Sequence, residues 1–504
     1  MTRDAAAIGA GLAPAREARA IAAGERIHVV GAGGAGASAA ALLAAASGAV
    51  VSGCDAGGPS PYTVALDAVG IEVVTGHDAA HVTDEPRPDR LAVTKALTAI
   101  DPDHPELRAA RDLGIPVEPW QQVIADAAVG RRLVAVAGTH GKSTTAGWLV
   151  HVLAEAGRDP SAFVGALLAA ALTGGTSATA RTGRGDVFVV EADEYAGNFD
   201  AYRPGLAVLT SIEWDHPDVF ADTAAVREAF VAWLARMPRG GTLVANVSDP
   251  GVAAILSRPE LAHLTVMGTA VHDAEKPADA AVRATVVEAG PTGTTLAIDG
   301  LADDAGTVEI RLPTAGRHNA ANALGVAGAA KVLGLPAADI VYGLETFPGV
   351  GRRLERKGES AGVVVYDDYG HHPTAIRATI EAVRQREPGR RIWAVYEPLT
   401  YHRTAALIDE FAASLATADA VVIADIWAGR DPDTTIASAA GLADTVATAR
   451  SDIPVAAPGS VEATSRWLAA NVRAGDAVLV MGGGRSYLIA TDLLERLDTE
   501  TGSR

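Results

Sequence analysis

The chain has 504 residues, which at roughly 150 residues per domain predicts about three domains. With 49% hydrophobic and 20% charged residues, its composition is that of a soluble globular protein and excludes large disordered or collagen-like regions. The net charge of −19 argues against nucleic acid or an anionic membrane as a partner. The single cysteine, Cys54, excludes a disulfide framework and a Cys-rich zinc module, and it suits a reducing cytoplasm.

Short β-branched runs alternate with helical stretches along most of the chain, which predicts parallel sheets built from βα units. The expected buried strands are 27–30, 50–52, 133–137, 187–190, 207–209, 242–245, 363–366, 392–395, 420–424 and 477–481. The region 264–312 differs, because short Val/Thr-rich runs are separated there by Gly-Pro and Asp-Gly turns. This pattern predicts a small antiparallel insert.

Two boundaries divide the chain, one before a new strand near 130–132 and one where Pro348, Gly349 and Gly351 cluster. We therefore expect a flexible extension over 1–25 and three domains over 26–130, 131–348 and 349–504. The first residues lack the continuous apolar run of a secretory signal, and the longest apolar run is too short to span a bilayer. We expect a cytoplasmic protein without membrane insertion.

A glycine-rich turn follows the first expected strand and contains Gly31, Gly33, Gly34 and Gly36. Asp55 lies about 20 residues further on, so the segment matches a dinucleotide-binding fingerprint. An NAD-dependent oxidoreductase is therefore one candidate function. Hydride transfer gives no role, however, to the phosphate-binding loop and the acidic strand ends that follow.

The strongest chemical signal begins at the end of the strand 133–137 and runs through a glycine turn into a helix. It contains Gly138, Thr139, His140, Gly141, Lys142, Ser143 and Thr144. Backbone N–H groups at such a helix start face phosphate oxygens, and the helix dipole adds to the attraction. Lys142 would supply positive charge to the β- and γ-phosphates, and the Ser143 hydroxyl could hold Mg²⁺. The usual first glycine of the motif is replaced by Val136, and a plain connecting turn is the alternative.

Two later strands end in acidic residues, the first with Glu191, Asp193 and Glu194 and the second with Asp215 followed by His216. Because strand ends in such sheets face the ligand crevice, these carboxylates are placed to hold a metal against a triphosphate. Histidine is an unusual Mg²⁺ ligand, and His216 suits helix capping or packing equally well.

Three further motifs carry polar side chains. The first is Gly-Arg-His-Asn-Ala-Ala-Asn at 316–322, and the second is Gly-Val-Gly-Arg-Arg at 349–353. The third, Asp-Asp-Tyr-Gly-His-His-Pro at 367–373, could suggest a transition-metal centre, but a second helix-borne set of ligands is missing.

In the order GTHGKST, EADE, DHP, GRHNAAN, GVGRR, DDYGHHP and TYHRT, these motifs resemble the Mur ligase family over roughly residues 26–497. The resemblance implies an α/β fold with an N-terminal Rossmann-like UDP-sugar domain, a central P-loop ATPase domain and a C-terminal Rossmann-like domain. It implies ligation of L-alanine to UDP-N-acetylmuramate through an acyl phosphate, in peptidoglycan precursor synthesis, with ATP as a substrate and Mg²⁺ as cofactor. A murein tripeptide as the amine and a non-catalytic nucleotide-binding paralogue remain alternatives, and the oligomeric state is open.

The resemblance also implies roles for individual residues. ATP would contact residues 138–144, His318, Asn319, Asn322, Arg352 and Asp367. Mg²⁺ would lie near Ser143, Glu191 and His216. Catalysis would involve Lys142, Glu191, His216, His371 and Arg403. The UDP diphosphate would lie on Gly31, Gly33, Gly34 and Gly36, with Asp55 beside it.

The chain departs from the family pattern in the half expected to bind the amine. Similar ligases usually carry Gln-Pro-His-Thr-Tyr-Ser-Arg-Thr, whereas this chain has Glu-Pro-Leu-Thr-Tyr-His-Arg-Thr at 397–404. Leu399 thus replaces a histidine, and His402 is the nearest imidazole that could take over its role. A late strand ends in Gly-Gly-Gly-Arg at 482–485 instead of Gly-Ala-Gly-Asp.

Overall fold

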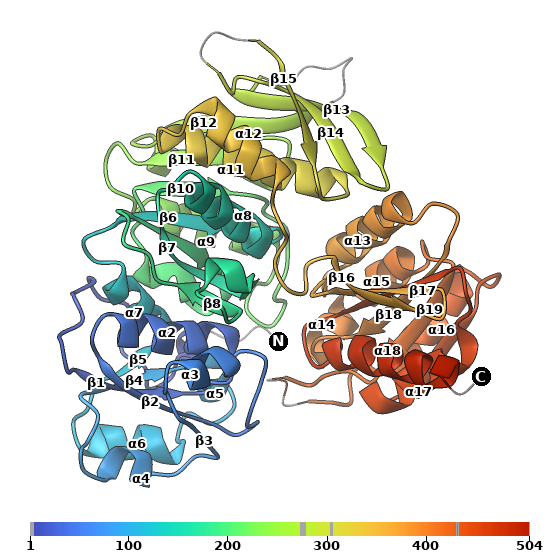
Figure 1. The fold of residues 1–504 in the computed structure, drawn as a ribbon. Coiled ribbons are helices and arrows are strands. Elements are labelled where there is room, and N and C mark those ends of the chain that lie inside the picture. Colours follow the sequence, from blue (N-terminus) through green and yellow to red (C-terminus); the bar gives the residue numbers. More distant parts are fainter. Residues whose placement is uncertain (1–4, 273–278, 303–305, 430, 432, 503–504) are drawn as a thin grey trace.

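The computed structural model describes residues 5–272, 279–302, 306–429, 431 and 433–502. In this part of the chain, three sheets of five, ten and six strands each form the centre of an α/β body. Figure 1 shows the first two bodies stacked and the third beside them. The expected α/β fold of three domains is confirmed. No helix within these residues is both long enough and apolar enough to cross a bilayer.

The first sheet is fully parallel, in the order β3-β2-β1-β4-β5. Its strands are β1 (Arg26–Val30), β2 (Val50–Asp55), β3 (Val73–Thr75), β4 (Arg90–Val93) and β5 (Val117–Pro119). Its helices are α2 (Ala35–Ala46), α3 (Val64–Ala68), α4 (Ala80–Thr83), α5 (Lys95–Thr98), α6 (Pro105–Asp112) and α7 (Trp120–Ala127). Strands β1 and β4 are buried on both faces and are mostly apolar, but β1 also carries the buried His28 and β4 begins with the buried Arg90. Helices α2 and α7 pack together on one face, whereas α4 and α6 cover the other.

The central sheet has the order β15-β14-β13-β12-β11-β10-β6-β9-β7-β8. Its strands are β6 (Arg132–Ala137), β7 (Ser161–Leu168), β8 (Ala178–Arg181), β9 (Val187–Ala192), β10 (Leu206–Leu209), β11 (Thr242–Asn246), β12 (Thr265–His272), β13 (Val282–Gly290), β14 (Gly293–Asp299) and β15 (Val308–Leu312). Strands β13, β14 and β15 are antiparallel, as the turn-rich sequence predicts. They are not a separate insert, however. Strand β12 pairs with β11 on one side and with β13 on the other, so the antiparallel strands extend the central sheet.

Helices cover both faces of the central sheet. They are α8 (Lys142–Glu155), α9 (Thr223–Leu234), α10 (Pro250–Ile255), α11 (Arg317–Val332) and α12 (Ala337–Glu345), with the short 3-10 helices η1 (Ala170–Leu172), η2 (Tyr195–Ala201) and η3 (Pro259–Leu261). Helices α8, α11 and α12 share one core, and α9 and α10 belong to the other. The second core continues into the first domain, where α2 packs on β7 and β8 and Trp120 meets Phe163 edge to face at 5.3 Å.

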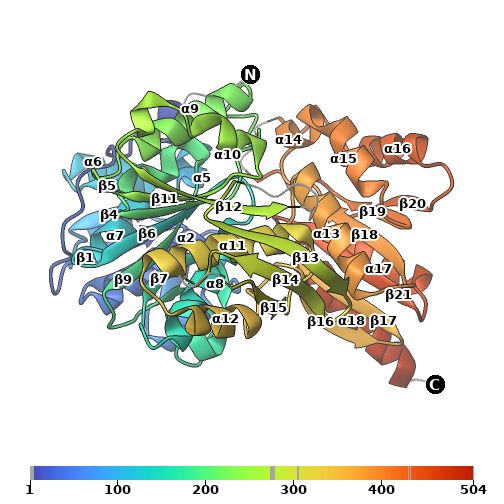
Figure 2. The same ribbon diagram turned by 90° about the horizontal axis from the view of Figure 1, so that it is seen from above.

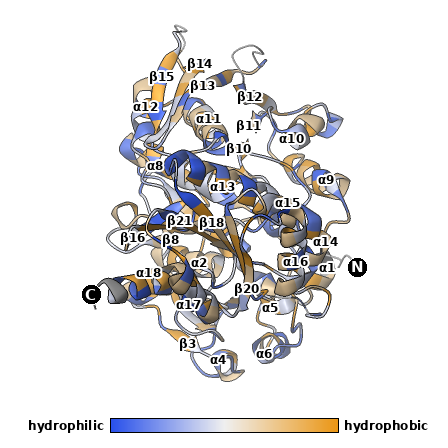
Figure 3. Ribbon diagram, turned by 90° about the vertical axis from the view of Figure 1, so that its right-hand side faces the viewer, coloured by the Kyte–Doolittle hydropathy of each residue, from blue (hydrophilic) through white to orange (hydrophobic). Residues whose placement is uncertain are grey.

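The third sheet has the order β16-β17-β21-β18-β19-β20, with only β16 antiparallel. Its strands are β16 (Glu355–Ser360), β17 (Val363–Asp368), β18 (Arg391–Glu397), β19 (Ala420–Ala424), β20 (Val455–Gly459) and β21 (Asp476–Gly482). Helices α13 (Pro373–Arg386), α14 (Tyr401–Ala406), α15 (Ile408–Leu415), α16 (Ala439–Ala449), α17 (Val461–Asn471) and α18 (Tyr487–Gly502) surround it. Figure 2 shows α13 beside the central domain, and Figure 3 shows the hydrophobic strands among helices of mixed hydropathy.

The segment before β1 lies against the first domain, although the sequence predicts a flexible extension there. After the short helix α1 (Ala5–Ile8), the Arg16 guanidinium pairs with Glu118 at 2.6 Å and with Asp126 at 2.8 Å. The buried Arg90 contacts the same two carboxylates. Arg16 therefore anchors this segment, because its positive charge compensates two buried carboxylates. Burying these carboxylates without a cation would be costly in free energy.

Candidate active site

A cavity of about 560 Å³ lies where the three domains meet. The first domain contributes Thr94, Lys95 and Trp120 to its wall, and the third contributes Arg353, His371 and Arg403. The central domain supplies the start of α8, the ends of β9 and β10, and the start of α11. Because the wall comes from three separate bodies, a ligand bound there would contact all of them.

The expected phosphate-binding loop joins β6 directly to α8, which is the strand–turn–helix arrangement that phosphate binding requires. Gly138 has φ 139° and Gly141 has φ 79°, values that side chains disfavour. A Cβ on Gly138 would overlap the Thr210 hydroxyl, and one on Gly141 would overlap the Asn322 side chain. Both positions therefore need glycine, and the turn leaves the start of α8 facing the cavity.

Lys142, the first residue of α8, lies between two carboxylates at the cavity wall. Its Nζ is 2.9 Å from Glu194 Oε2 and 3.5 Å from Asp193 Oδ1. Burial raises the pKa of Glu194 to about 7, although Lys142 opposes this shift. Burial also disfavours the charge on Lys142, but the carboxylates outweigh it and the pKa of the amine is raised. Lys142 is therefore a fixed cation at the loop.

Ser143 and Glu191 form a pair of oxygen donors beside this lysine. Ser143 Oγ donates to Glu191 Oε1 at 2.9 Å, and the Gly165 amide holds the other carboxylate oxygen at 2.6 Å. Close by, ligand atoms of Asp193, Glu194 and His216 lie within 4.8 Å of one another. Hydroxyl and carboxylate oxygens are the donors that Mg²⁺ prefers, so this chemistry fits the ion.

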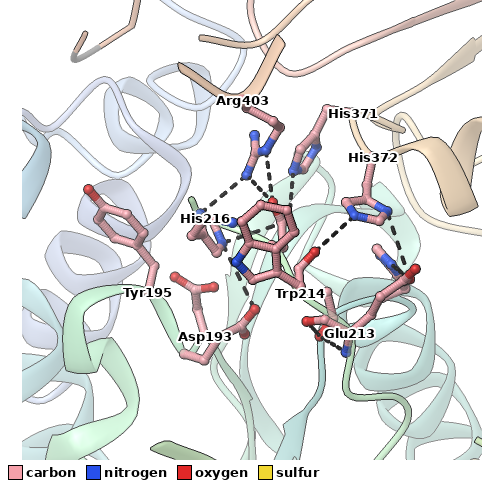
Figure 4. Close-up of polar contacts among 12 residues, drawn as sticks. Asp193, Tyr195, Glu213, Trp214, His216, His371, His372 and Arg403 are labelled. Atoms are coloured by element: carbon pink, nitrogen blue, oxygen red, sulfur yellow. Dashed lines mark hydrogen bonds and ion pairs between the residues drawn. The ribbon is translucent and has the colours of Figure 1, made fainter. Parts of the chain in front are cut away.

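Asp215 and His216 of the central domain meet Arg403 and His371 of the third domain. Arg403 donates to Asp215 Oδ1 from Nε at 2.8 Å, and its Nη2 lies 3.2 Å from His216 Nδ1. His371 Nε2 lies 3.9 Å from Asp215 Oδ2. Figure 4 shows the Arg403 guanidinium directed towards His216, with His371 beside it. Although burial opposes ionisation, Arg403 holds the pKa of Asp215 well below its usual range.

A second contact between these domains centres on Glu213, which sequence reasoning missed. Its carboxylate lies 2.8 Å from His140 Nε2 and accepts from the Thr374 hydroxyl at 2.7 Å. The His372 ring lies 3.8 Å from the same carboxylate, and its centroid lies 4.7 Å from that of His140 with the two rings tilted by 44°. The only sequence signals for this contact were the histidines in the motifs at 138–144 and 367–373. These two motifs, from the central and the third domain, thus meet in a polar contact between the domains.

His318, Asn319 and Asn322, expected at the adenine, line the same cavity from the first turns of α11. The Asn322 amide donates to Asn319 Oδ1 at 3.2 Å, and the Asn319 amide donates to the Ala315 carbonyl at 2.8 Å. These bonds fix the amides next to the phosphate-binding loop.

Arg352 and Asp367, expected near the nucleotide, do not line the cavity. Arg352 instead donates to Asp367 Oδ2 at 3.1 Å and to the Gly482 carbonyl at 2.8 Å, inside the third domain. Their chain neighbours Arg353 and Asp368 line the cavity, and Arg353 donates to Ser143 Oγ at 2.8 Å. Successive residues of a strand point to opposite faces, so the motif alone did not tell which aspartate faces the ligand.

The glycine loop after β1, with Gly31, Gly33, Gly34 and Gly36, also lies outside the cavity wall. The Asp55 carboxylate accepts from the Gly33 amide at 2.9 Å and from the Gly57 amide at 2.8 Å. In a dinucleotide site this carboxylate would bind ribose hydroxyls, whereas here it holds the loop itself. This arrangement disfavours NAD as the ligand of the glycine loop.

Leu399, which replaces the expected histidine, lines the cavity, but His402 does not. His402 Nδ1 instead lies 3.2 Å from Asp431 Oδ1. The compensating role expected for His402 therefore has no support in the geometry.

A phosphate-binding loop with acidic strand ends, enclosed by two further α/β domains, defines a nucleotide-dependent enzyme. Comparison with known families narrows this class. The chain matches "Mur ligase family, catalytic domain" over residues 26–132, "Mur ligase middle domain" over 136–330 and "Mur ligase, glutamate ligase domain" over 352–484. The chain belongs to the Mur ligase family, whose members are ATP-dependent amide-bond-forming ligases.

Its relatives include UDP-N-acetylmuramate–L-alanine ligases. That of Acidothermus cellulolyticus is 39% identical, with 93% of this chain and 94% of the relative covered. That of Mycobacterium marinum is 40% identical, with 94% and 95% covered. Among solved structures, the UDP-N-acetylmuramate–alanine ligase of Thermotoga maritima shares the fold, with TM-score 0.76, 23% identity, and 95% of this chain and 100% of that one covered. A murein peptide ligase of Psychrobacter arcticus has TM-score 0.70 at 26% identity, with 94% and 99% covered.

Proposed function

We propose that this protein joins L-alanine to UDP-N-acetylmuramate with cleavage of ATP to ADP and phosphate, in the synthesis of peptidoglycan precursors. The observation that carries the proposal is the cavity between the three domains, where the phosphate-binding loop faces His371 and Arg403. The relatives named above, similar over nearly their whole length, act on the same substrates by name. We place the reaction in the cytoplasm because it consumes ATP and the chain has one free, buried cysteine.

The first step is phosphoryl transfer. The lactyl carboxylate of UDP-N-acetylmuramate attacks the γ-phosphorus of ATP, an acyl phosphate forms and ADP leaves. Lys142 and the amides at the start of α8 stabilise charge on the transferring group, because they are fixed before the reaction begins. The N-terminal glycine loop would hold the UDP diphosphate, so the two substrates approach from different domains.

Ser143 and Glu191 would hold Mg²⁺ beside the triphosphate, and His216 is the third expected ligand. When bound, the ion supplies positive charge that offsets the phosphate oxygens. Arg353 contacts the same hydroxyl from the third domain, so that domain supplies a further cation beside the triphosphate.

In the second step, the amine of L-alanine attacks the acyl carbon and phosphate leaves. Burial and the neighbouring Arg403 hold the pKa of His371 well below its usual range. The ring is therefore neutral and can accept a hydrogen bond from the amine, which an imidazolium could not do. The surrounding domains exclude water from the acyl phosphate.

The test is phosphate release by the purified protein with ATP, Mg²⁺, UDP-N-acetylmuramate and single amino acids. We expect release with L-alanine and at most about a hundredth of that rate in Lys142→Ala. Release only with murein tripeptide would favour the second candidate, which the replaced histidine at Leu399 supports because this residue lines the cavity. Nucleotide binding without release would indicate a non-catalytic paralogue, and a change in NADH absorbance would indicate an oxidoreductase.

A further inference from the structure

A cluster of metal-binding side chains lies in the first domain, on the face of the sheet opposite α2. His28 comes from β1, Cys54 from β2, His81 from α4 and Glu106 from α6. Their ligand atoms all lie within 4.8 Å of one another, and His28, Cys54 and Glu106 are buried. None of these residues lines the cavity between the domains, so the proposed ligase reaction leaves the cluster unexplained.

Glu106 lies at the centre of the cluster. Its carboxylate is 3.3 Å from Cys54 Sγ, 2.9 Å from His81 Nδ1 and 3.7 Å from His28 Nε2. A fifth donor, His77 Nδ1, lies 3.2 Å from Cys54 Sγ. A thiol, a carboxylate and several imidazoles, which are all groups that bind transition-metal ions, are thus held together in a buried place.

The ring of His28 gives independent support for a ligand. Its Nδ1 contacts the Ser52 hydroxyl at 2.8 Å, which fixes the ring and turns Nε2 towards Glu106. The ring is 3% exposed, and Nε2 has no hydrogen-bond partner among the described residues. A buried ring nitrogen without a partner is costly, whereas a metal bond would satisfy it. Pairing of the second ring nitrogen with a neighbour is the usual arrangement for a histidine that binds metal.

We propose that His28, Cys54, His81 and Glu106 bind a zinc-class transition-metal ion. A tetrahedral ion of this kind holds its ligand atoms roughly 3.2–3.8 Å apart, close to the separations in the cluster. Sulfur and imidazole nitrogen suit Zn²⁺, whereas Mg²⁺ takes oxygen ligands. The site is therefore distinct in place and in chemistry from the magnesium site at the phosphate-binding loop. The ion would tie α4 and α6 to the strands β1 and β2.

The test uses Co²⁺ as a spectroscopic probe of the full-length protein. The protein is stripped with a chelator, supplied with excess Mg²⁺ to occupy the nucleotide site, and titrated with Co²⁺. Because Cys54 is the only cysteine in the chain, a thiolate-to-cobalt charge-transfer band has a single source. We expect the band to saturate at one ion per chain and to disappear when Zn²⁺ is added.

Three variants test which side chains bind the ion. Cys54→Ser should lose the band, and His81→Gln should weaken Co²⁺ binding about ten- to a hundred-fold. His263→Gln is the matched control, since that ring bonds two backbone carbonyls in the central domain. Absence of a thiolate band at micromolar Co²⁺ in the unaltered protein would overturn the proposal, whether or not the variants fold. Equal affinity in His81→Gln and the control would overturn it as well.

Discussion

Arg352 and Arg353 are neighbours in the chain, but their side chains contact different parts of the molecule. Arg353 contacts Ser143 across the domain boundary, whereas Arg352 binds Asp367 and the end of β21 within its own domain. Burial raises the pKa of Asp367 to about 6 even with Arg352 beside it. The two side chains therefore offer a matched pair for separating nucleotide binding from stability.

We predict that Arg353→Ala lowers kcat/KM for ATP about ten- to a hundred-fold, because one charge-assisted hydrogen bond at the loop is lost. Its free energy of unfolding should stay within about 0.5 kcal/mol of the unaltered value. Arg352→Ala should instead cost about 3 kcal/mol of stability by leaving Asp367 without its cation. Steady-state kinetics and urea unfolding of both variants provide the measurements.

The pH dependence gives a further check on this pair. When folding raises the pKa of a carboxyl group, the free energy of unfolding falls as the pH rises. The fall begins near the pKa of the group in the unfolded chain, about 4, and ends above its pKa in the folded protein. Loss of Arg352 raises that pKa further, so the stability defect of Arg352→Ala should be larger at pH 8 than at pH 5. A defect of equal size at both values would contradict the pairing with Asp367.

At the scale of elements, the turn between β6 and α8 depends on glycine for two separate reasons. At Gly138 the backbone conformation disfavours a side chain, and the space for a Cβ is filled by Thr210 and the Ser211 backbone. At Gly130, just before β6, φ is 84° but nothing lies within 4 Å of an added Cβ. Comparing the two positions therefore separates conformational strain from steric overlap.

Gly138→Ala should destabilise the protein by more than about 3 kcal/mol, or displace the loop and abolish ATP binding. Gly130→Ala should cost only about 1–2 kcal/mol, because strain alone acts there, and ATP binding should persist. Urea unfolding and nucleotide titration by calorimetry measure both effects. Normal ATP binding and stability in Gly138→Ala would show that the turn is not held as the structure has it.

At the scale of the molecule, the third domain is held to the central one by the buried contact between Arg403 and Asp215, at 2.7 Å. Arg403 is 2% exposed and Asp215 is 4% exposed, so solvent screens this pair little. Removing one partner of such a pair leaves the other buried and uncompensated, which typically costs 3–5 kcal/mol. Separation of the domains would let water reach the carboxylate.

We predict that Arg403→Met releases the third domain, raises the radius of gyration measured by X-ray scattering and abolishes ligation. Arg384→Met is the control, since Arg384 pairs with Asp419 at 3.3 Å on the surface of the same domain. This variant should keep the unaltered scattering curve and activity, because exposed pairs contribute little. Identical scattering of both variants would mean that other contacts set the domain arrangement.

The sequence by itself determined the fold class and the local part of the site. Each of the ten expected strands lies within an observed strand, because a buried parallel strand needs a continuous apolar run. Seven strands outside the region 264–312 were not predicted. Five of them lie at sheet edges, namely β3, β5, β8, β16 and β20. The other two, β4 and β7, are buried, but β4 has only four residues and begins with Arg90, and β7 is rich in small residues. The loop from Gly138 to Ser143 could be predicted equally well, since the strand, the turn and the helix start are consecutive in the chain.

Only the tertiary structure decided which side chains meet. The sequence did not tell Arg352 from Arg353, because the direction of a side chain near a strand end depends on how its domain packs. Arg403 meets Asp215 from a separate domain, and the cluster around Glu106 draws on two strands and two helices. Local patterns record the backbone conformation of each segment, but they carry no information about the positions of segments far apart in the chain. Contacts between such segments follow from burying apolar surface over the whole molecule, so they appear only when the chain is folded.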